Sequence, residues 1–206
     1  MTYKFGNQET TVVGGLTAAE AAAGWRILHV PDWRTPSADA ASFANVTIGN
    51  NQDANGLNIN TKAWSFGGSG GGDRDFIVSG DAGSFMWLPD GSINTARIRF
   101  MWGQVAGATG NQDVVWIFGA IQSGDDGSGN QVLTIDDTGT KDVRATSAAL
   151  EEPAVRYGYH TTTIDLTLTS WAQLPTMFYL GRDRTNTTGD DMNNAAIVYG
   201  IQVLVK

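Results

Sequence analysis

The chain has 206 residues, which is enough for one β domain with a sizeable core, because sandwiches and barrels often reach this length undivided. It contains no cysteine, so disulfides and thiolate metal sites are excluded, and hydrophobic burial and hydrogen bonding must hold the fold. Its 21 acidic and 13 basic residues give a formal charge of −8, which opposes nonspecific binding to nucleic acid, where cationic side chains neutralise phosphates.

Membrane insertion and secretion are not indicated by any segment. No stretch approaches the ~20 consecutive apolar residues of a membrane span. The first residues lack the basic region followed by an apolar region that a secretory signal needs. We therefore expect no membrane partner and no nucleic-acid partner, and we expect the protein to accumulate in a cytoplasm.

The first sixty residues predict one short helix among strands. Thr17 and Glu20 have the spacing of a capping box, in which the two side chains satisfy free backbone amides reciprocally. The alanine-rich stretch that follows stops at Gly24, a typical helix end. We expect a helix of about two turns here and no other helix in the chain. Strands are expected around it at residues 9–13, 25–30 and 44–48.

The rest of the chain is typical of a run of amphipathic strands. The clearest is 160–168, where one face carries His160, Thr162, Ile164, Leu166 and Leu168 and the other carries Thr161, Thr163, Asp165 and Thr167. Further strands are expected at residues 62–66, 75–78, 84–88, 97–102, 113–118, 177–180 and 197–205. Turn signals separate most of them, which favours an all-β fold over a βαβ architecture. We predict a jelly-roll-like β-sandwich with one short N-terminal helix.

Both faces of one strand, residues 114–121, are apolar. A strand of an isolated two-sheet sandwich normally has one face in water. We therefore expect something to cover the outer face of this strand, either the N-terminal segment or another copy of the chain.

A fixed order of strand motifs runs through residues 61–206. The motifs are Phe66, then 88–92, 96–102, 110–116, 160–163 and 178–184, followed by a last apolar strand. This order resembles a jelly-roll module of bacteriophage virion surface proteins, which occurs in capsid decoration proteins, head spikes and tail appendages. The resemblance implies a homotrimer on the virion surface, made in the host cytoplasm. Residues 1–60 match no motif, and we predict that they form an N-terminal attachment segment for the jelly-roll sandwich at 61–206.

Catalytic and metal-binding motifs are not found in the sequence. The only two histidines, His29 and His160, do not suffice for a structural zinc site, and His160 is expected in the core or at its rim. There is no Gly-x-Ser-x-Gly elbow. Adjacent carboxylates occur at 125–126, 136–137, 151–152 and 190–191. Neighbours on a strand point to opposite faces, so such pairs do not by themselves give the ~5 to ~9.5 Å separation of a glycosidase.

Two oxygen-rich stretches, 125–130 and 189–194, suggest calcium loops, but they lack the spaced ligands and terminal glutamate of an EF-hand. Solvated loop charge is the favoured interpretation of the adjacent carboxylate pairs, and calcium binding is not favoured at either stretch. We expect no metal, no cofactor and no enzymatic activity.

The seven tryptophans are the strongest functional signal. Trp102 and Trp116 lie in apolar strands and are expected in the core. The other five lie near strand ends or loops, where an aromatic ring can pack in the core, bury in a subunit interface or stack on a sugar. These candidate interface or glycan-stacking residues are Trp25, Trp33, Trp64, Trp87 and Trp171.

The sequence and the resemblance together favour a non-enzymatic virion structural protein. In this interpretation it is a capsid decoration (cement) or head-spike protein that docks on the major capsid protein and stabilises the shell. The alternative is a receptor-binding or glycan-binding tail appendage, which would bind host surface glycan. A third hypothesis, an enzyme that acts on surface polysaccharide, needs carboxylates brought together from distant loops.

Overall fold

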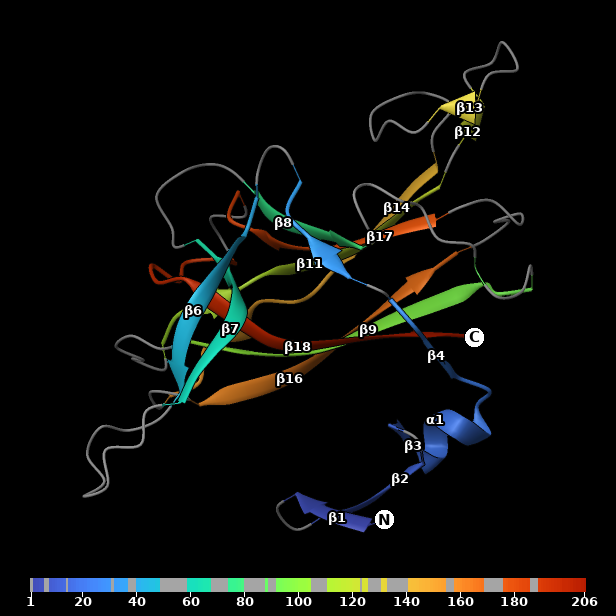
Figure 1. Ribbon diagram of the computed structural model, residues 1–206, viewed down its shortest axis with the longest axis horizontal. Coiled ribbons are helices and arrows are strands. Elements are labelled where there is room, and N and C mark those ends of the chain that lie inside the picture. The colour runs from blue at the N-terminus through green and yellow to red at the C-terminus, as the bar shows by residue number, and fades with distance from the viewer. Residues whose placement is uncertain are drawn as a thin grey trace.

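The protein is a sandwich of two antiparallel sheets in a computed structural model (Figure 1). The structure describes residues 2–5, 8–13, 15–30, 32–36, 40–48, 59–67, 74–79, 88, 92–104, 111–122, 124–125, 131–132, 141–154, 158–168, 176–185 and 189–206. No helix in these segments is long and apolar enough to cross a membrane.

The first sheet has six strands. Its order is β16 (Tyr159–Thr167), β9 (Thr95–Gly103), β18 (Ala196–Val205), β7 (Ile59–Phe66) and β6 (Ser42–Ile48), and β4 (Arg26–Leu28) also pairs with β18. The second sheet has the order β14 (Lys141–Thr146), β11 (Trp116–Gln122), β17 (Thr176–Asp183), β8 (Arg74–Ser79) and β5 (Trp33–Arg34). The strands named here pair antiparallel throughout, and one isolated bridge, between Ala40 and Phe76 of β8, is parallel.

Smaller pairings lie outside the two main sheets. They are β1 (Thr2–Phe5) with β2 (Gln8–Val13) and β3 (Leu16–Thr17), β10 (Asp113–Val114) with β15 (Leu150–Glu151), and β12 (Gly124–Asp125) with β13 (Gln131–Val132).

The strand order is that of a jelly roll. The strands β7, β9, β16 and β18 lie in the first sheet, and β8, β11, β14 and β17 lie in the second. Each sheet therefore combines strands that are far apart in the chain, as two Greek keys wound together require. This confirms the all-β, jelly-roll-like sandwich that the sequence predicts.

The short helix α1 (Ala18–Ala22) begins with the predicted capping box. The Thr17 hydroxyl accepts the N–H of Glu20 at 3.1 Å, and the Glu20 carboxylate accepts the N–H of Thr17 at 2.9 Å. Gly24, with φ at +82°, adopts the left-handed conformation that ends a helix at low cost. The helix has five residues, so it is shorter than the two turns that the sequence predicts.

Strands from the first sixty residues take part in both sheets. β4 and β6 extend the first sheet, and β5 pairs with β8 at the edge of the second. Residues 26–48 thus contribute strands to the sandwich, and the chain crosses from one sheet to the other between β4 and β5. An attachment role for residues 1–60 stays a prediction.

Aromatic rings fill the centre of the core. Trp116 is in contact with Phe66, Phe100 and Trp102, with ring centroids 5.1, 5.1 and 5.6 Å apart. All four side chains are fully buried, as the sequence predicts for the two tryptophans. The Trp102 indole N–H donates to the Thr162 hydroxyl at 2.8 Å. These edge-to-face contacts fix the distance between the two sheets.

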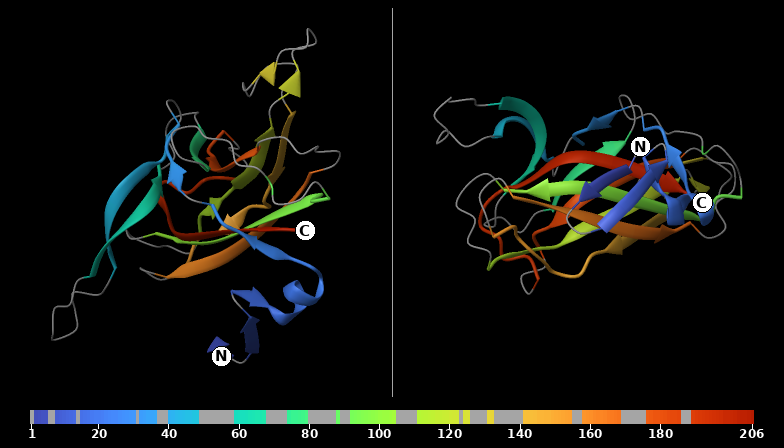
Figure 2. Two further views of the ribbon diagram at one scale, coloured as in Figure 1. Left: turned by 45° about the vertical axis from the view of Figure 1, so that its right-hand side comes forward. Right: turned by 90° about the horizontal axis from the view of Figure 1, so that it is seen from below.

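The outer face of β11 is also buried, as the apolar pattern at 114–121 predicts. Ile117, Ile121 and Tyr179 form a cluster on this side. The Tyr179 ring lies over Gly119, where a Cβ atom would stand 2.0 Å from the ring carbon Cζ. Side chains of the same sheet thus help to cover this face. The elements β1, β2, β3 and α1 lie on the other side of the molecule, against the outer face of the first sheet (Figure 2).

A buried arginine joins several loops at one end of the sandwich. Arg182 and Asp190 are both fully buried, and their closest N–O distance is 2.6 Å. All five N–H groups of the guanidinium donate, since the Arg182 side chain also bonds to the carbonyls of Gly67, Met192 and Asn194. The network holds the segment before β18 against the ends of β7 and β17.

Candidate functional site

Three aromatic side chains converge where the β4–β5 segment passes the β6–β7 hairpin. Phe43 of β6 and Trp64 of β7 are directly opposite each other in the ladder, which places them on the same face. Their ring centroids are 4.6 Å apart and tilted by 41°. Trp33 comes from the other sheet, where it pairs with Ser79. Two strand pairings that are independent of each other therefore bring the three rings together.

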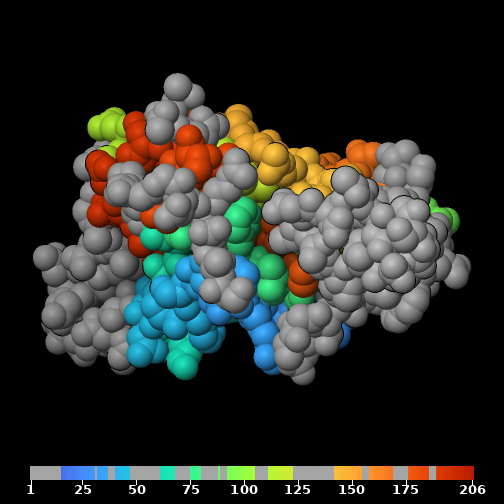
Figure 3. Space-filling model, turned by 90° about the horizontal axis from the view of Figure 1, so that it is seen from above, coloured from blue at the N-terminus to red at the C-terminus, as the bar shows by residue number. Residues whose placement is uncertain are grey.

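These rings line a hollow of about 390 Å³, together with Val30 and Asp32. We call it the aromatic hollow. Phe43 is 52% exposed, which is unusual for a large apolar side chain, and Trp33 and Trp64 are half-buried. Figure 3 shows the cyan β6 atoms and the blue atoms of the β4–β5 segment on one face, with a notch between them.

Packing against the core fixes the two tryptophans. Both Trp33 and Trp64 are in contact with the main core cluster, so part of each ring is held by the sandwich while the ring also lines the hollow. The Asp32 carboxylate accepts the N–H of Trp33 at 2.8 Å, which orients the chain at this point. A ligand would meet a largely preformed surface and would lose little free energy in ordering it.

Charged groups of both signs surround the aromatic hollow. The exposed side chains of Asp32 and Arg34 form an ion pair with a 3.3 Å N–O distance. The Lys62 ammonium lies 5.6 Å from the centroid of the Phe43 ring, within range of a cation–π interaction. The hollow thus has an aromatic floor with hydrogen-bond donors and acceptors at its rim, which suits an amphipathic ligand such as a sugar.

The other candidate tryptophans lie elsewhere. Trp25 is 6% exposed, and two cations lie over its ring. The distances to the ring centroid are 4.5 Å from the Arg97 Cζ atom and 5.0 Å from the Lys206 Nζ atom. Trp87 and Trp171 lie outside the described residues. The structure therefore brings together Trp33 and Trp64 of the five candidates.

Phe43 belongs to the site but is missed by the sequence analysis. The strand predicted at 44–48 begins one residue after Phe43, whereas β6 begins at Ser42. The only signal that could have found it is the hairpin register, which places Phe43 opposite Trp64.

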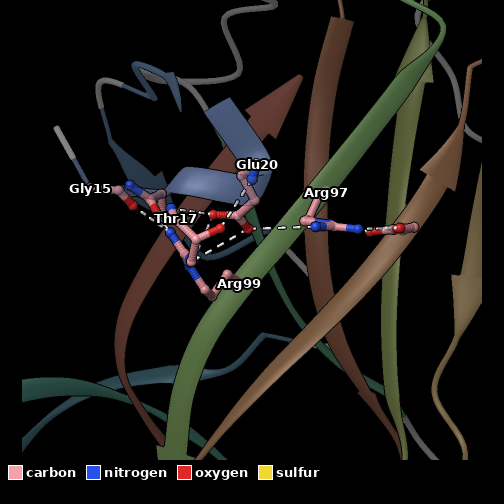
Figure 4. A network of polar contacts seen from close by, with 7 residues as sticks. Gly15, Thr17, Glu20, Arg97 and Arg99 are labelled. Carbon is pink, nitrogen blue, oxygen red and sulfur yellow. Dashed lines mark hydrogen bonds and ion pairs between the residues drawn. The ribbon is translucent and has the colours of Figure 1, made fainter. Parts of the chain in front are cut away.

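An ionic network anchors the N-terminal segment to the first sheet (Figure 4). Glu20 accepts from Arg99 at 3.2 Å and from Arg97 at 3.5 Å, and Arg97 also binds Asp165 with N–O distances of 2.5 and 2.7 Å. Arg99 donates to the carbonyl of Gly15 at 2.6 Å. Burial alone would raise the pKa of Glu20, but hydrogen bonds from Thr17 and the charges of Arg99 and Arg97 outweigh it and hold the pKa below its ordinary value.

A second hollow of about 410 Å³ lies beside β15 and β16 and contains carboxylates. Glu151 and His160 are exposed in it, whereas Glu152 is buried and accepts a hydrogen bond from Gln104. The two neighbouring glutamates thus differ sharply in exposure, as expected for adjacent residues of an extended chain. His160 lies at the rim of the core, with its ring 5.6 Å from that of Trp102.

Metal ligands are not clustered in the described segments, where no group of three or more His, Asp or Glu side chains is placed to hold an ion. In the stretch 189–194, Asp190 binds Arg182, and the Asp191 carboxylate accepts the N–H of Asp113 at 2.6 Å. Most of the other oxygen-rich stretch, residues 126–130, lies outside the described residues.

No protein-family model matches the chain, and no curated protein is similar to it in sequence. Solved structures share the sandwich at low identity. An arabinose-bound MgGH51 α-L-arabinofuranosidase is 12% identical over 92% of this chain, with a TM-score of 0.45. The enzymatically active domain of tailspike protein 4 of bacteriophage CBA120 is 9% identical over 94%, with a TM-score of 0.36. A carbohydrate-binding module of Cellvibrio mixtus lichenase 5A, in complex with cellotriose, is 12% identical over 85%, with a TM-score of 0.36.

The chain spans 24% of the arabinofuranosidase and 21% of the tailspike domain, but 97% of the carbohydrate-binding module. Similarity at this level concerns the β-sandwich and assigns no activity to the chain. It does correct one expectation. The sequence analysis excludes an enzyme, and that exclusion is wrong, because two of these similar chains are enzymes by name. A series of amphipathic strands does not rule out catalysis.

Proposed function

We propose that the chain is a glycan-binding module and that the aromatic hollow is its binding site. The observation that carries the proposal is the exposed Phe43 ring beside Trp64, facing a hollow that Trp33 also lines. One face of a sugar ring consists of C–H groups with a partial positive charge. Such a face packs well on an aromatic ring, whose π face is negative.

The polar rim supports a sugar over a purely apolar partner. Sugar hydroxyls need donors and acceptors at the edge of the stacked ring. The Asp32 carboxylate already accepts from the Trp33 N–H and from Arg34, and its oxygens retain further lone pairs. Lys62 supplies donors beside Phe43 and would also attract an anionic sugar such as a uronate.

The proposed biological setting is a phage tail appendage that attaches to the host surface through a glycan. This setting depends on the resemblance of the strand motifs to virion surface modules. The competing interpretation is a homotrimeric capsid decoration protein bound to the major capsid protein. It predicts that Phe43 and Trp64 become buried between copies or against the shell. A trimer in light scattering of the purified protein, together with binding of that trimer to empty shells, would favour the decoration protein.

The test is a glycan panel with the purified chain. The panel contains host cell-surface polysaccharide and linear oligosaccharides of one to six units, in β-1,4-glucose, β-1,4-mannose and α-1,4-galacturonate series. We expect binding to at least one series, and a loss of at least about tenfold in Phe43→Ala and Trp64→Ala. Tyr159→Ala is the matched control, because Tyr159 is 50% exposed and lies on β16, at the opposite edge of the sheet from β6. Absence of binding to every glycan, or equal binding by Phe43→Ala, would overturn the proposal.

A further inference from the structure

The edge of β18 that faces β7 is only partly occupied. β7 pairs with this edge at Ala196 to Val198, and β4 pairs with it at Val203 to Val205. Between them, at residues 200–202, no described strand pairs with β18 on this side. A register shift between Val198 and Gly200 accompanies the break. Within the described part of the chain, the first sheet is therefore open over a short length beside the β4–β5 segment.

A hollow of about 370 Å³ lies at this opening. We call it the β18 hollow. Its floor is apolar and is formed by side chains of β4 and β18, and polar groups stand at its border. Its lining residues are Ile27, Leu28, His29, Val30, Trp33, Ile201, Gln202 and Val203. His29 is exposed, and Gln202 is held by a hydrogen bond from Arg99.

The two hollows have a common wall. Val30 and Trp33 line both the β18 hollow and the aromatic hollow, so the two spaces lie on either side of the same short segment. Each volume falls within the ~300 to ~1,000 Å³ typical of ligand pockets. Both combine an apolar floor with polar groups at the rim, which is the pattern that an amphipathic ring needs.

We propose that the ligand is a linear oligosaccharide that crosses Trp33 and places sugar units in both hollows. This inference depends on the proposed glycan-binding function and adds to it the class of ligand, a chain of several units in place of a single sugar. A monosaccharide would use the aromatic hollow alone. A longer chain would gain the contacts of the β18 hollow as well, so its affinity should rise with length until both hollows are filled.

The experiment is calorimetric titration with the oligosaccharide series that gives the strongest signal on the panel, from one to six units. We expect the affinity to increase at least about tenfold between one and four units and then to level off. His29→Trp should fill the β18 hollow, and His29→Ala should remove a wall of it. Both variants should keep the wild-type affinity for the monosaccharide and lose the gain with length. His160→Ala, at the only other histidine, is the control and should behave as wild type.

The possible failures are distinguishable. If no sugar binds at all, both the glycan-binding function and the two-hollow site are overturned. If binding depends on Phe43 but is equal for short and long oligosaccharides, the function stands and the two-hollow site is overturned. Retention of the length dependence in His29→Trp would also overturn the two-hollow site, because a blocked β18 hollow cannot supply the gain.

Discussion

Replacing Arg182 with methionine should destabilise the protein more than any substitution of an exposed charge. The change removes the guanidinium but keeps most of the side-chain length. It leaves the Asp190 carboxylate buried without its cation, and three backbone carbonyls lose their donors. Removing one partner of a buried ion pair costs about 3 to 5 kcal/mol. For a chain of this length each kcal/mol lowers the melting temperature by about 2 to 4 °C, so we expect a decrease of about 6 to 20 °C.

Urea unfolding, followed by tryptophan fluorescence, measures this loss of free energy directly. Arg34→Met is the control: it breaks an ion pair whose two side chains are exposed, and it should cost less than about 1 kcal/mol. Adding Asp190→Leu to Arg182→Met should restore part of the stability, since no unpaired charge remains, although the carbonyls still lack donors. A loss below about 1 kcal/mol in Arg182→Met would refute the view that this arginine holds the end of the sandwich together.

Two further predictions concern the packing of Gly119 in the second sheet and the ionic contacts of Glu20. Gly119→Ala places a Cβ atom against the Tyr179 ring and should cost about 1 to 3 kcal/mol in urea unfolding, and Tyr179→Leu in the same chain should relieve part of it. Because the pKa of Glu20 is lowered in the folded state, its contribution to stability is fully present above the unfolded value of about 4.3 and is lost as pH falls through the lower folded pKa. The protection of the backbone amides at residues 15–24, taken relative to their intrinsic exchange rates at each pH, should therefore fall below pH ~4 in the wild type, whereas in Glu20→Gln it should already be lower at neutral pH and change little with acid. Unchanged exchange in Glu20→Gln would show that the ionic network does not anchor this segment.

The features that the sequence predicts correctly are those that local patterns encode. Thr17 and Glu20 form the capping box within one helical turn, so their spacing is sufficient to predict it. The alternation in β16 places Ile164 and Leu166 in the core, and period-two patterns need no knowledge of the partner strand. The burial of Trp116 follows from the apolar residues beside it.

The binding site cannot be predicted in the same way, because it depends on pairings between distant segments. Trp33 reaches the site through a two-residue strand that pairs with β8, which is too short for any periodic signal. Phe43 and Trp64 meet only through the register of the β6–β7 hairpin. The exclusion of an enzyme failed for a related reason: strand patterns describe the sheets, whereas clefts and their side chains depend on how loops and edges meet.

The most direct test of the central claim is binding of the glycan panel to wild-type protein, Phe43→Ala and Tyr159→Ala in parallel. Both substitutions remove an exposed aromatic ring from the first sheet, but only Phe43 lines the aromatic hollow. The account predicts that wild type and Tyr159→Ala bind the same glycan with equal affinity, and that Phe43→Ala binds it at least about tenfold more weakly. Equal affinity of all three proteins, or binding by none of them, would contradict it.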